Sequence, residues 1–154
     1  MKDSSIYLRN SIKELKLKCK EVEIKGEFEN EGSMFEEIAF LNGFCKESNV
    51  PLNIKIGGSE ALRDIYELSY LGIDGIICPM VESAFSVKKF KESIKKVKKI
   101  KNFKKRAILV ETITGLENLK KIIQECDDNI NTLIIGRNDL SASLEIEKAI
   151  TVDV

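Results

Sequence analysis

The stretch Ala107-Ile-Leu-Val-Glu-Thr-Ile-Thr-Gly-Leu-Glu117 contains the pattern that decides the fold of this 154-residue chain. Four apolar residues come first, a polar cluster begins at Glu111, and Thr114 and Glu117 have the spacing of a capping box at the start of a helix. A short, continuous apolar run is typical of a parallel strand covered on both faces. The stretch therefore predicts a buried strand, a loop and then a helix.

The same order of apolar run, polar cluster and helical segment occurs five times along the chain. The apolar runs comprise residues 22–24, 52–56, 73–78, 107–110 and 132–135. Further helix starts are predicted at Ser33, which forms a capping-box pattern with Glu36, and at Ser59 and Ser83 as N-caps. Strands that alternate with helices predict an α/β fold with a parallel sheet.

Two more segments have helical spacing. Apolar residues recur among lysines within residues 1–20, which predicts a helix that covers one end of the sheet. Residues 87–103 are rich in lysine, but their apolar residues recur every three or four positions. We therefore interpret the lysine face of this second helix as solvated. Residues 145–154 are expected to form a short tail with one or two helical turns, so the chain is predicted to be a single domain over residues 1–154.

The composition excludes several classes of protein. Lys and Arg number 25, as do Asp and Glu, so no global positive field favours nucleic acid or an anionic membrane, and neither is expected as a partner. The chain has no histidine, so Ser-His-Asp and Cys-His catalytic systems and zinc sites with histidine ligands are excluded. Four cysteines without a CxxC pair, and no secretory or membrane-spanning segment, predict a cytoplasmic protein with reduced thiols.

The polar clusters follow the strands directly, at residues 27–31, 55–60, 79–83, 111–115 and 136–139. In parallel α/β folds these positions share one rim, at the carboxyl ends of the strands, where ligands bind. Side chains alternate between the two faces along a strand, so Lys55 and Glu111 are each expected to be the last inward-facing residue of its own strand. Glu111 and Asp139 follow neighbouring strands, about 4.8 Å apart, and can share a divalent ion through oxygen ligands.

Such a metal site would leave most coordination positions open to substrate. This suits a 2-oxo acid, which chelates a metal through its carboxylate and ketone oxygens while the metal stabilises an enolate as a Lewis acid. The backbone N–H groups of Asn138 and Asp139, at the start of a helix, can hold the substrate carboxylate.

Three segments, in this order and spacing, resemble the HpcH/HpaI aldolase and citrate lyase family. They are Pro79-Met-Val-Glu-Ser83, Leu109-Val-Glu-Thr112 and Ile134-Ile-Gly-Arg-Asn-Asp-Leu-Ser-Ala-Ser-Leu144. The resemblance covers about residues 21–144. It implies a pyruvate-kinase-like (β/α)₈ barrel and carbon–carbon bond cleavage or formation through an enolate of a 2-oxo acid or acyl substrate. It also implies Mg²⁺ or Mn²⁺ at Glu111 and Asp139, with the substrate carboxylate at the backbone of Asn138 and Asp139. Gly136, directly before this turn, is predicted to bind substrate as well.

The chain departs from the family pattern at three positions of the rim. Lys55 is the nearest match to an arginine that binds substrate oxygens, but it lacks the bidentate guanidinium. A Glu-His pair after the first strand reads Glu27-Phe28 here, so proton transfer would need Glu29, Glu31 or water instead. Arg137 replaces a proline and is a candidate to supply the missing guanidinium. The catalytic residues are thus predicted to be Glu27, Lys55 and Arg137, with Lys55 also binding substrate.

Five strand and helix units occupy the whole sequence, whereas a complete eight-unit barrel needs about 250 residues. We therefore expect a partial barrel with open edge strands, which self-associates or pairs with a complementing chain. Two alternatives remain open at this point. A five-stranded doubly wound domain fits the length, and a degenerate family member that binds a ligand or partner without turnover fits the loss of histidine.

Overall fold

The computed structural model describes residues 2–28, 31–97 and 103–145. The elements in chain order are α1 (Lys2–Lys18), β1 (Ile24–Glu27), α2 (Phe35–Ser48), β2 (Leu52–Lys55), α3 (Leu62–Leu71), β3 (Gly75–Cys78), α4 (Ala84–Val97), β4 (Lys105–Val110), α5 (Ile113–Glu117), α6 (Leu119–Glu125), β5 (Thr132–Ile135) and α7 (Arg137–Ser143). The predicted helical tail lies outside the described residues, apart from Glu145. None of the helices in these ranges combines the length and the apolar character that crossing a membrane requires.

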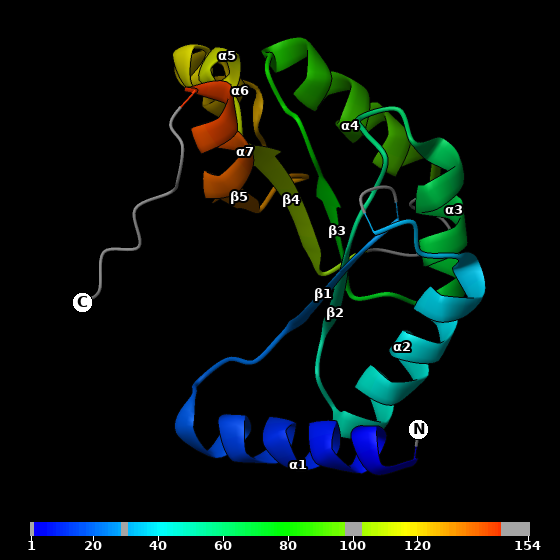
Figure 1. The fold of residues 1–154 in the computed structure, drawn as a ribbon. Coiled ribbons are helices and arrows are strands. Elements are labelled where there is room, and N and C mark those ends of the chain that lie inside the picture. Colours follow the sequence, from blue (N-terminus) through cyan, green and yellow to red (C-terminus); the bar gives the residue numbers. More distant parts are fainter. Residues whose placement is uncertain (1, 29–30, 98–102, 146–154) are drawn as a thin grey trace.

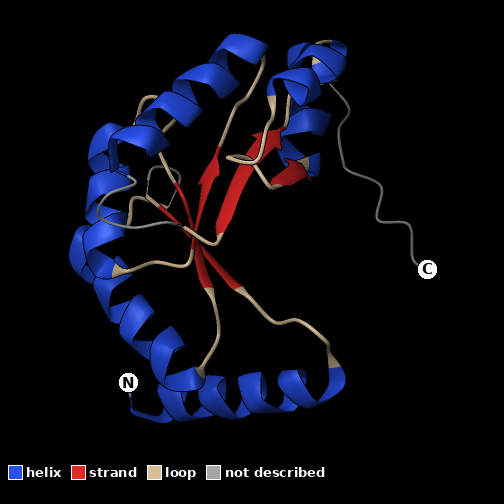
Figure 2. Ribbon diagram, turned by 180° about the vertical axis from the view of Figure 1, so that it is seen from behind, coloured by secondary structure: helices blue, strands red, loops and turns tan. Residues whose placement is uncertain are grey.

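The strands form one parallel sheet in the order β1-β2-β3-β4-β5. A doubly wound domain reverses its strand order at one point of the sheet, so that helices cover both faces. Here the order never reverses, and α2, α3 and α4 follow one another along the same outer face (Figures 1 and 2). This arrangement confirms the predicted partial (β/α) barrel and excludes the doubly wound alternative.

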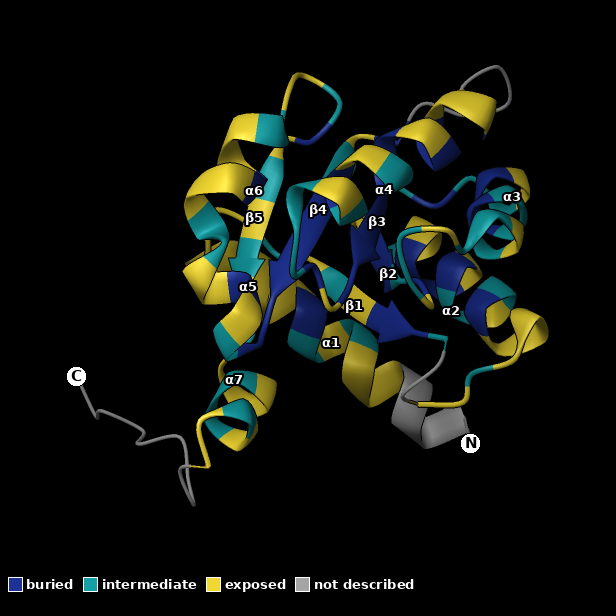
Figure 3. Ribbon diagram, turned by 90° about the horizontal axis from the view of Figure 1, so that it is seen from above, coloured by how far each residue is buried: buried dark blue, intermediate teal, exposed yellow. Residues whose placement is uncertain are grey.

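The two faces of the sheet differ in what they contact. Outward-facing residues such as Ile76, Ile108 and Val110 are fully buried in the main core beneath the helices. Inward-facing Leu109 instead packs in a small apolar cluster with Ile77, Ala107 and Ile134. Figure 3 shows β2, β3 and β4 coloured as buried over most of their length. The alternation predicted along β4 is therefore confirmed, and it directs Glu111 to the inner face.

Helix α1 lies beneath the amino ends of the strands, as the sequence predicts (Figure 1). Its Ile12 is buried, and the guanidinium of Arg9 lies 5.3 Å from the ring centre of Phe44 on α2. Lys16 Nζ donates to the carbonyl oxygen of Asn49, at the end of α2, over 3.0 Å. These contacts close the end of the sheet opposite the rim of polar clusters.

Two predicted capping boxes are displaced. The first begins at Met34 rather than Ser33, with the Met34 N–H donating to Glu37 Oε2 over 2.8 Å. In α5 the cap is Thr112, whose Oγ1 accepts from the N–H of Gly115, so the predicted cap Thr114 lies inside the helix. Neither observed cap has the Ser/Thr-x-x-Glu spacing, since Met34 is not a hydroxyl residue and Gly115 stands three residues after Thr112, so the pattern places each helix start only to within one or two residues.

Of the two predicted N-caps, one is confirmed and one is wrong, and the first strand lies further along the chain than predicted. Ser83 caps α4, because its Oγ accepts from the N–H of Ser86 over 3.2 Å. Ser59 does not cap α3, whose N-cap is Ala61, because residues 58–60 form a turn before the helix begins. The first strand was predicted at residues 22–24 but extends from Ile24 to Glu27, where it pairs with β2.

The lysine face of α4 is only partly solvated. Lys88, Lys95 and Lys96 are exposed as predicted, but Lys91 is buried. Lys91 Nζ donates to the carbonyl oxygen of Glu125 over 2.6 Å and also forms ion pairs with Glu125 Oε1 and Asp127 Oδ2, at 2.7 and 3.3 Å. This side chain therefore joins α4 to the end of α6, and its interpretation as a solvated lysine was wrong.

Candidate functional site

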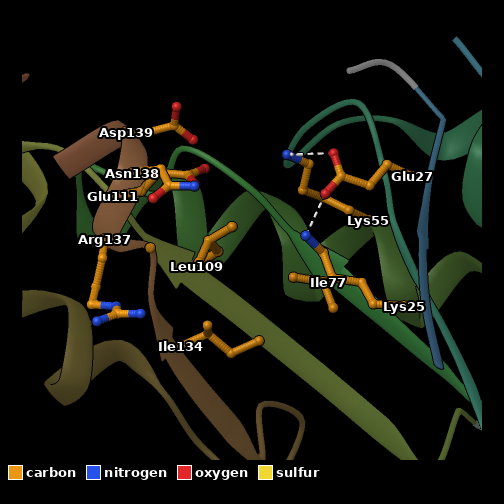
Figure 4. A pocket seen from close by; sticks show the side chains of 11 residues that line it. Lys25, Glu27, Lys55, Ile77, Leu109, Glu111, Ile134, Arg137, Asn138 and Asp139 are labelled. Atoms are coloured by element: carbon orange, nitrogen blue, oxygen red, sulfur yellow. Dashed lines mark hydrogen bonds and ion pairs between the residues drawn. The ribbon is translucent and has the colours of Figure 1, made fainter. Parts of the chain in front are cut away.

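The carboxyl ends of the strands surround a pocket of about 360 Å³ on the inner face of the sheet (Figure 4). All seven predicted site residues line this pocket: Glu27, Lys55, Glu111, Gly136, Arg137, Asn138 and Asp139. Its floor consists of the inner apolar side chains Ile77, Leu109 and Ile134. The structure thus brings the predicted residues together at one rim, while their roles stay predictions.

One side of the pocket carries a buried ion pair. Glu27 and Lys55 are register partners on β1 and β2, and Lys55 Nζ lies 2.9 Å from Glu27 Oε2. Lys25, two residues earlier on the same strand face, pairs with Glu27 Oε1. Burial alone would raise the pKa of Glu27, but hydrogen bonds and charge from the two lysines outweigh burial and lower it.

The opposite side carries the two carboxylates expected to hold a metal. Glu111 follows β4 and Asp139 lies in the first turn of α7, after β5 (Figure 4). Burial is the largest cause that raises the pKa of Glu111, and the adjacent Asp139 raises it further through a hydrogen bond and like charge. A hydrogen bond from the N–H of Met80 and the charge of Lys55 oppose this rise without cancelling it.

Two backbone features fix the position of the Glu111 carboxylate. The N–H of Met80 donates to Glu111 Oε1 over 3.0 Å. Gly136 leaves space on the other side, because a Cβ at that position would lie 2.7 Å from Glu111 Cβ and 2.8 Å from Glu111 Oε2. A glycine is therefore required at the end of β5 for Glu111 to occupy this place.

The remaining predicted residues belong to the first turn of α7. Arg137, Asn138 and Asp139 are exposed at the pocket. The first N–H groups of a helix have no carbonyl partner within it, so those of Asn138 and Asp139 suit an anionic ligand. In Figure 4 the Arg137 guanidinium extends away from Glu111 and Asp139, on the side of Ile134. Arg137 lines the pocket, and its role as the substitute guanidinium stays a prediction.

The sequence did not point to two residues that contact the site, Lys25 and Met80, and it did not show where the side chain of Phe28 lies. Lys25 was not selected, although its spacing of two from Glu27 places both on one strand face. Met80 contributes only a backbone N–H, which its residue type does not reveal. Phe28, which stands where the resemblance leads one to expect a histidine, packs against the outer core rather than lining this pocket. Glu29, one suggested substitute base, lies outside the described residues, and Glu31 is exposed.

The residues present fit a divalent cation with an open coordination sphere. Neighbouring carboxylates that repel one another, as the buried Glu111 and the exposed Asp139 do, are stabilised by a cation between them. Within the described ranges, no cluster of three or more acidic, cysteine or histidine side chains offers a fuller set of ligands. The predicted metal site likewise has only two protein ligands, both carboxylates, and leaves the other coordination positions to substrate and water.

The family model described as HpcH/HpaI aldolase/citrate lyase matches residues 33–151 of this chain. The chain belongs to this family. A search of curated proteins finds no match. The match contains the segments that supply Lys55, Glu111 and Asp139, so membership and pocket geometry concern the same residues.

Solved structures of the family share the fold. The chain is similar to an HpcH/HpaI aldolase from Desulfitobacterium hafniense DCB-2, with 18% identity and a TM-score of 0.65 over 79% of this chain and 55% of that one. It is also similar to the citrate synthase SbnG, with 19% identity and a TM-score of 0.64 over 82% of this chain and 55% of that one. A family protein from Burkholderia cenocepacia J2315 has 12% identity and a TM-score of 0.65, with 79% and 58% covered. The chain thus spans just over half the length of these relatives.

Proposed function

We propose that the protein is a divalent-metal-dependent carbon–carbon lyase of the aldolase type, acting on a 2-oxo acid or acyl substrate. The observation that carries this proposal is the pair of carboxylates, Glu111 and Asp139, interacting at the mouth of a pocket that also presents Lys55. A Mg²⁺ or Mn²⁺ ion held there would act as a Lewis acid toward the enolate that forms when the adjacent carbon–carbon bond breaks or is made.

The chain's own groups would bind and orient the substrate. Lys55 offers a positive charge to substrate oxygens, and the N–H groups of Asn138 and Asp139 face the substrate carboxylate. Glu27 holds Lys55 in place and remains ionised at neutral pH, because its pKa is lowered. Lys25 and Lys55 pair with the two carboxylate oxygens of Glu27. We therefore assign proton transfer to a water molecule in the pocket, next to the fixed negative charge of Glu27.

Metal binding and enolate chemistry are tested separately. Titration calorimetry with Mn²⁺ should give heat with the unmodified chain and none with Glu111→Gln or Asp139→Asn, whereas the exposed Glu117→Gln should bind as the unmodified chain does. Exchange of the methyl protons of pyruvate in D₂O, followed by NMR, should then require Mg²⁺ or Mn²⁺ and both carboxylates. Absence of Mn²⁺ heat in the unmodified chain would exclude the proposal.

A second candidate is a family member that binds a ligand without turnover. The specific observation in its favour is that the whole sequence lacks histidine, and with it the base of the related aldolases. This candidate predicts Mn²⁺ binding that depends on Glu111 and Asp139, but no exchange of pyruvate protons. The two measurements above therefore separate an enzyme from a binding protein.

We also propose that the chain self-associates or pairs with a complementing chain. Leu133 and Ile135, on the outer face of β5, are 39% and 42% exposed, while their register partners Ile108 and Val110 on β4 are fully buried. Within the described residues β5 pairs only with β4, and an open apolar edge favours association. Light scattering after size exclusion should show a mass above 17 kDa, and a stable monomer would contradict this proposal.

The chain is proposed to act in the cytoplasm. Cys19, Cys45, Cys78 and Cys126 are free thiols. Burial raises the pKa of Cys45 to about 11 and that of Cys78 to about 12, so both stay protonated and unreactive at neutral pH. Such thiols suit a reducing compartment. Expression of a tagged chain followed by fractionation tests the location.

A further inference from the structure

Met80 has an unusual backbone conformation at the rim of the pocket. Its φ angle is +53°, in the left-handed region that residues other than glycine rarely adopt. Asn49, with φ +51°, shares this conformation, but it ends helix α2, where left-handed residues are common. Met80 terminates no helix, and the residue is 54% exposed. Packing of the side chain therefore does not account for the conformation.

The conformation directs two successive N–H groups to β4. The N–H of Met80 donates to Glu111 Oε1 over 3.0 Å, and the N–H of Val81 donates to the carbonyl oxygen of Leu109 over 3.1 Å. In an extended chain successive N–H groups point to opposite sides, so an extended residue at this position would lose one of these bonds. The left-handed residue keeps both, and it attaches the loop after β3 to the end of β4.

We propose that Met80 is a positioning residue whose left-handed backbone fixes Glu111 for metal binding. The bond to Oε1 orients the carboxylate, and Oε2 then lies beside Gly136, in the space that the glycine leaves. This inference rests on the proposed function, because it assumes that Glu111 and Asp139 bind the metal. It adds a role for the backbone of a residue whose side chain contacts neither carboxylate through a hydrogen bond or ion pair.

Three variants of the full chain test this role. Met80→Val should disfavour the left-handed conformation, because β-branched residues tolerate it least. Met80→Gly should retain the conformation and the N–H while removing the side chain. Asn49→Val is the matched control, since it introduces the same conflict at the opposite end of the sheet. Mn²⁺ affinity is measured by calorimetry, and thermal unfolding of each variant is followed by circular dichroism.

Met80→Val should weaken Mn²⁺ binding by about 10- to 100-fold, as is typical when a group that orients a metal ligand is disturbed. Met80→Gly should bind Mn²⁺ as the unmodified chain does, and Asn49→Val should lower the melting temperature without changing the affinity. Unchanged affinity in Met80→Val, or weakened affinity in Met80→Gly or Asn49→Val, would overturn the inference. Failure of the unmodified chain to bind Mn²⁺ would instead contradict the proposed function.

Discussion

Glu27 and Lys55 lie directly opposite each other on the parallel strands β1 and β2, with Lys55 Nζ 2.9 Å from Glu27 Oε2. Their side chains are only 9% and 12% exposed, so each charge depends on the other. This pair holds Lys55, the side chain proposed to contact substrate oxygens, in place at the pocket.

Lys55→Met should lower the free energy of unfolding by about 1 to 3 kcal/mol, because the Glu27 carboxylate loses a partner while it remains buried. Lys25 retains contact with its other oxygen. Urea denaturation at neutral pH measures the change. The control is Lys18→Met, which breaks an exposed pair with Glu14 and should cost no more than about 0.5 kcal/mol. Equal losses in the two variants would contradict the importance of burial.

The pH dependence of stability should have opposite signs for the two buried glutamates. The folded-state pKa of Glu111 lies above its ordinary 4.5, so its contribution to stability is present below that value and is lost as pH rises through the folded pKa. Without metal, Glu111→Gln should therefore gain stability relative to the unmodified chain between about pH 4 and pH 7.

Glu27 should show the reverse trend, because its pKa is lowered. Its contribution is present above 4.5 and is lost as pH falls through the folded pKa. The loss of stability caused by Glu27→Gln, relative to the unmodified chain, should consequently be largest at neutral pH and smaller at low pH. Urea denaturation across this range, with a chelator present, measures both variants. Parallel profiles for the two would show that the pKa directions are wrong.

Gly136→Ala should damage the metal site more than the fold. The added Cβ would displace the Glu111 carboxylate, so Mn²⁺ affinity should fall at least about tenfold, while overpacking should cost about 1 to 3 kcal/mol. Gly43→Ala is the control, because its added Cβ in helix α2 would meet nothing within 4 Å apart from the adjacent backbone of the helix. It should stabilise the helix by about 0.5 to 1 kcal/mol and leave Mn²⁺ binding unchanged.

Lys91→Met should lower the free energy of unfolding by about 1.5 to 3 kcal/mol, since it removes a charged hydrogen bond to the carbonyl of Glu125. Hydrogen bonds from the backbone and side chain of Asn129, together with Lys91, lower the pKa of Asp127 to about 2. The contribution of Asp127 to the free energy of unfolding should thus persist above pH 3.8 and disappear as the pH falls toward 2. The exposed Lys95→Met should change stability by less than about 0.5 kcal/mol.

The fold and the placement of the site were predictable because they depend on patterns within single segments. Continuous apolar runs located the sheet, and alternation along the strands directed Lys55 and Glu111 to one pocket. Family membership, expected from three short motifs, is confirmed by the match over residues 33–151. Each of these predictions needed only the order of residues along one strand and its following loop.

The remaining features depend on contacts between distant segments. Lys91 has the spacing of a solvated residue, but its partners lie on a segment more than thirty residues later. The N-cap of α3 is Ala61 rather than Ser59, because a turn closed by the hydrogen bond from the Ala61 N–H to the Gly58 carbonyl oxygen precedes the helix. The contact from Met80 to Glu111 uses a backbone N–H, which every residue but proline possesses. Residue type alone cannot reveal it.

Asp139 follows β5, which has one hydrogen-bonded neighbour among the described strands, whereas Glu111 follows β4, which has two. An outermost strand of this kind is the part of a sheet that opens most readily. Any ligand that bridges the two carboxylates would therefore clamp β5 onto β4. Its occupancy should appear as slower amide hydrogen exchange in residues 132–135, even before any turnover is measured.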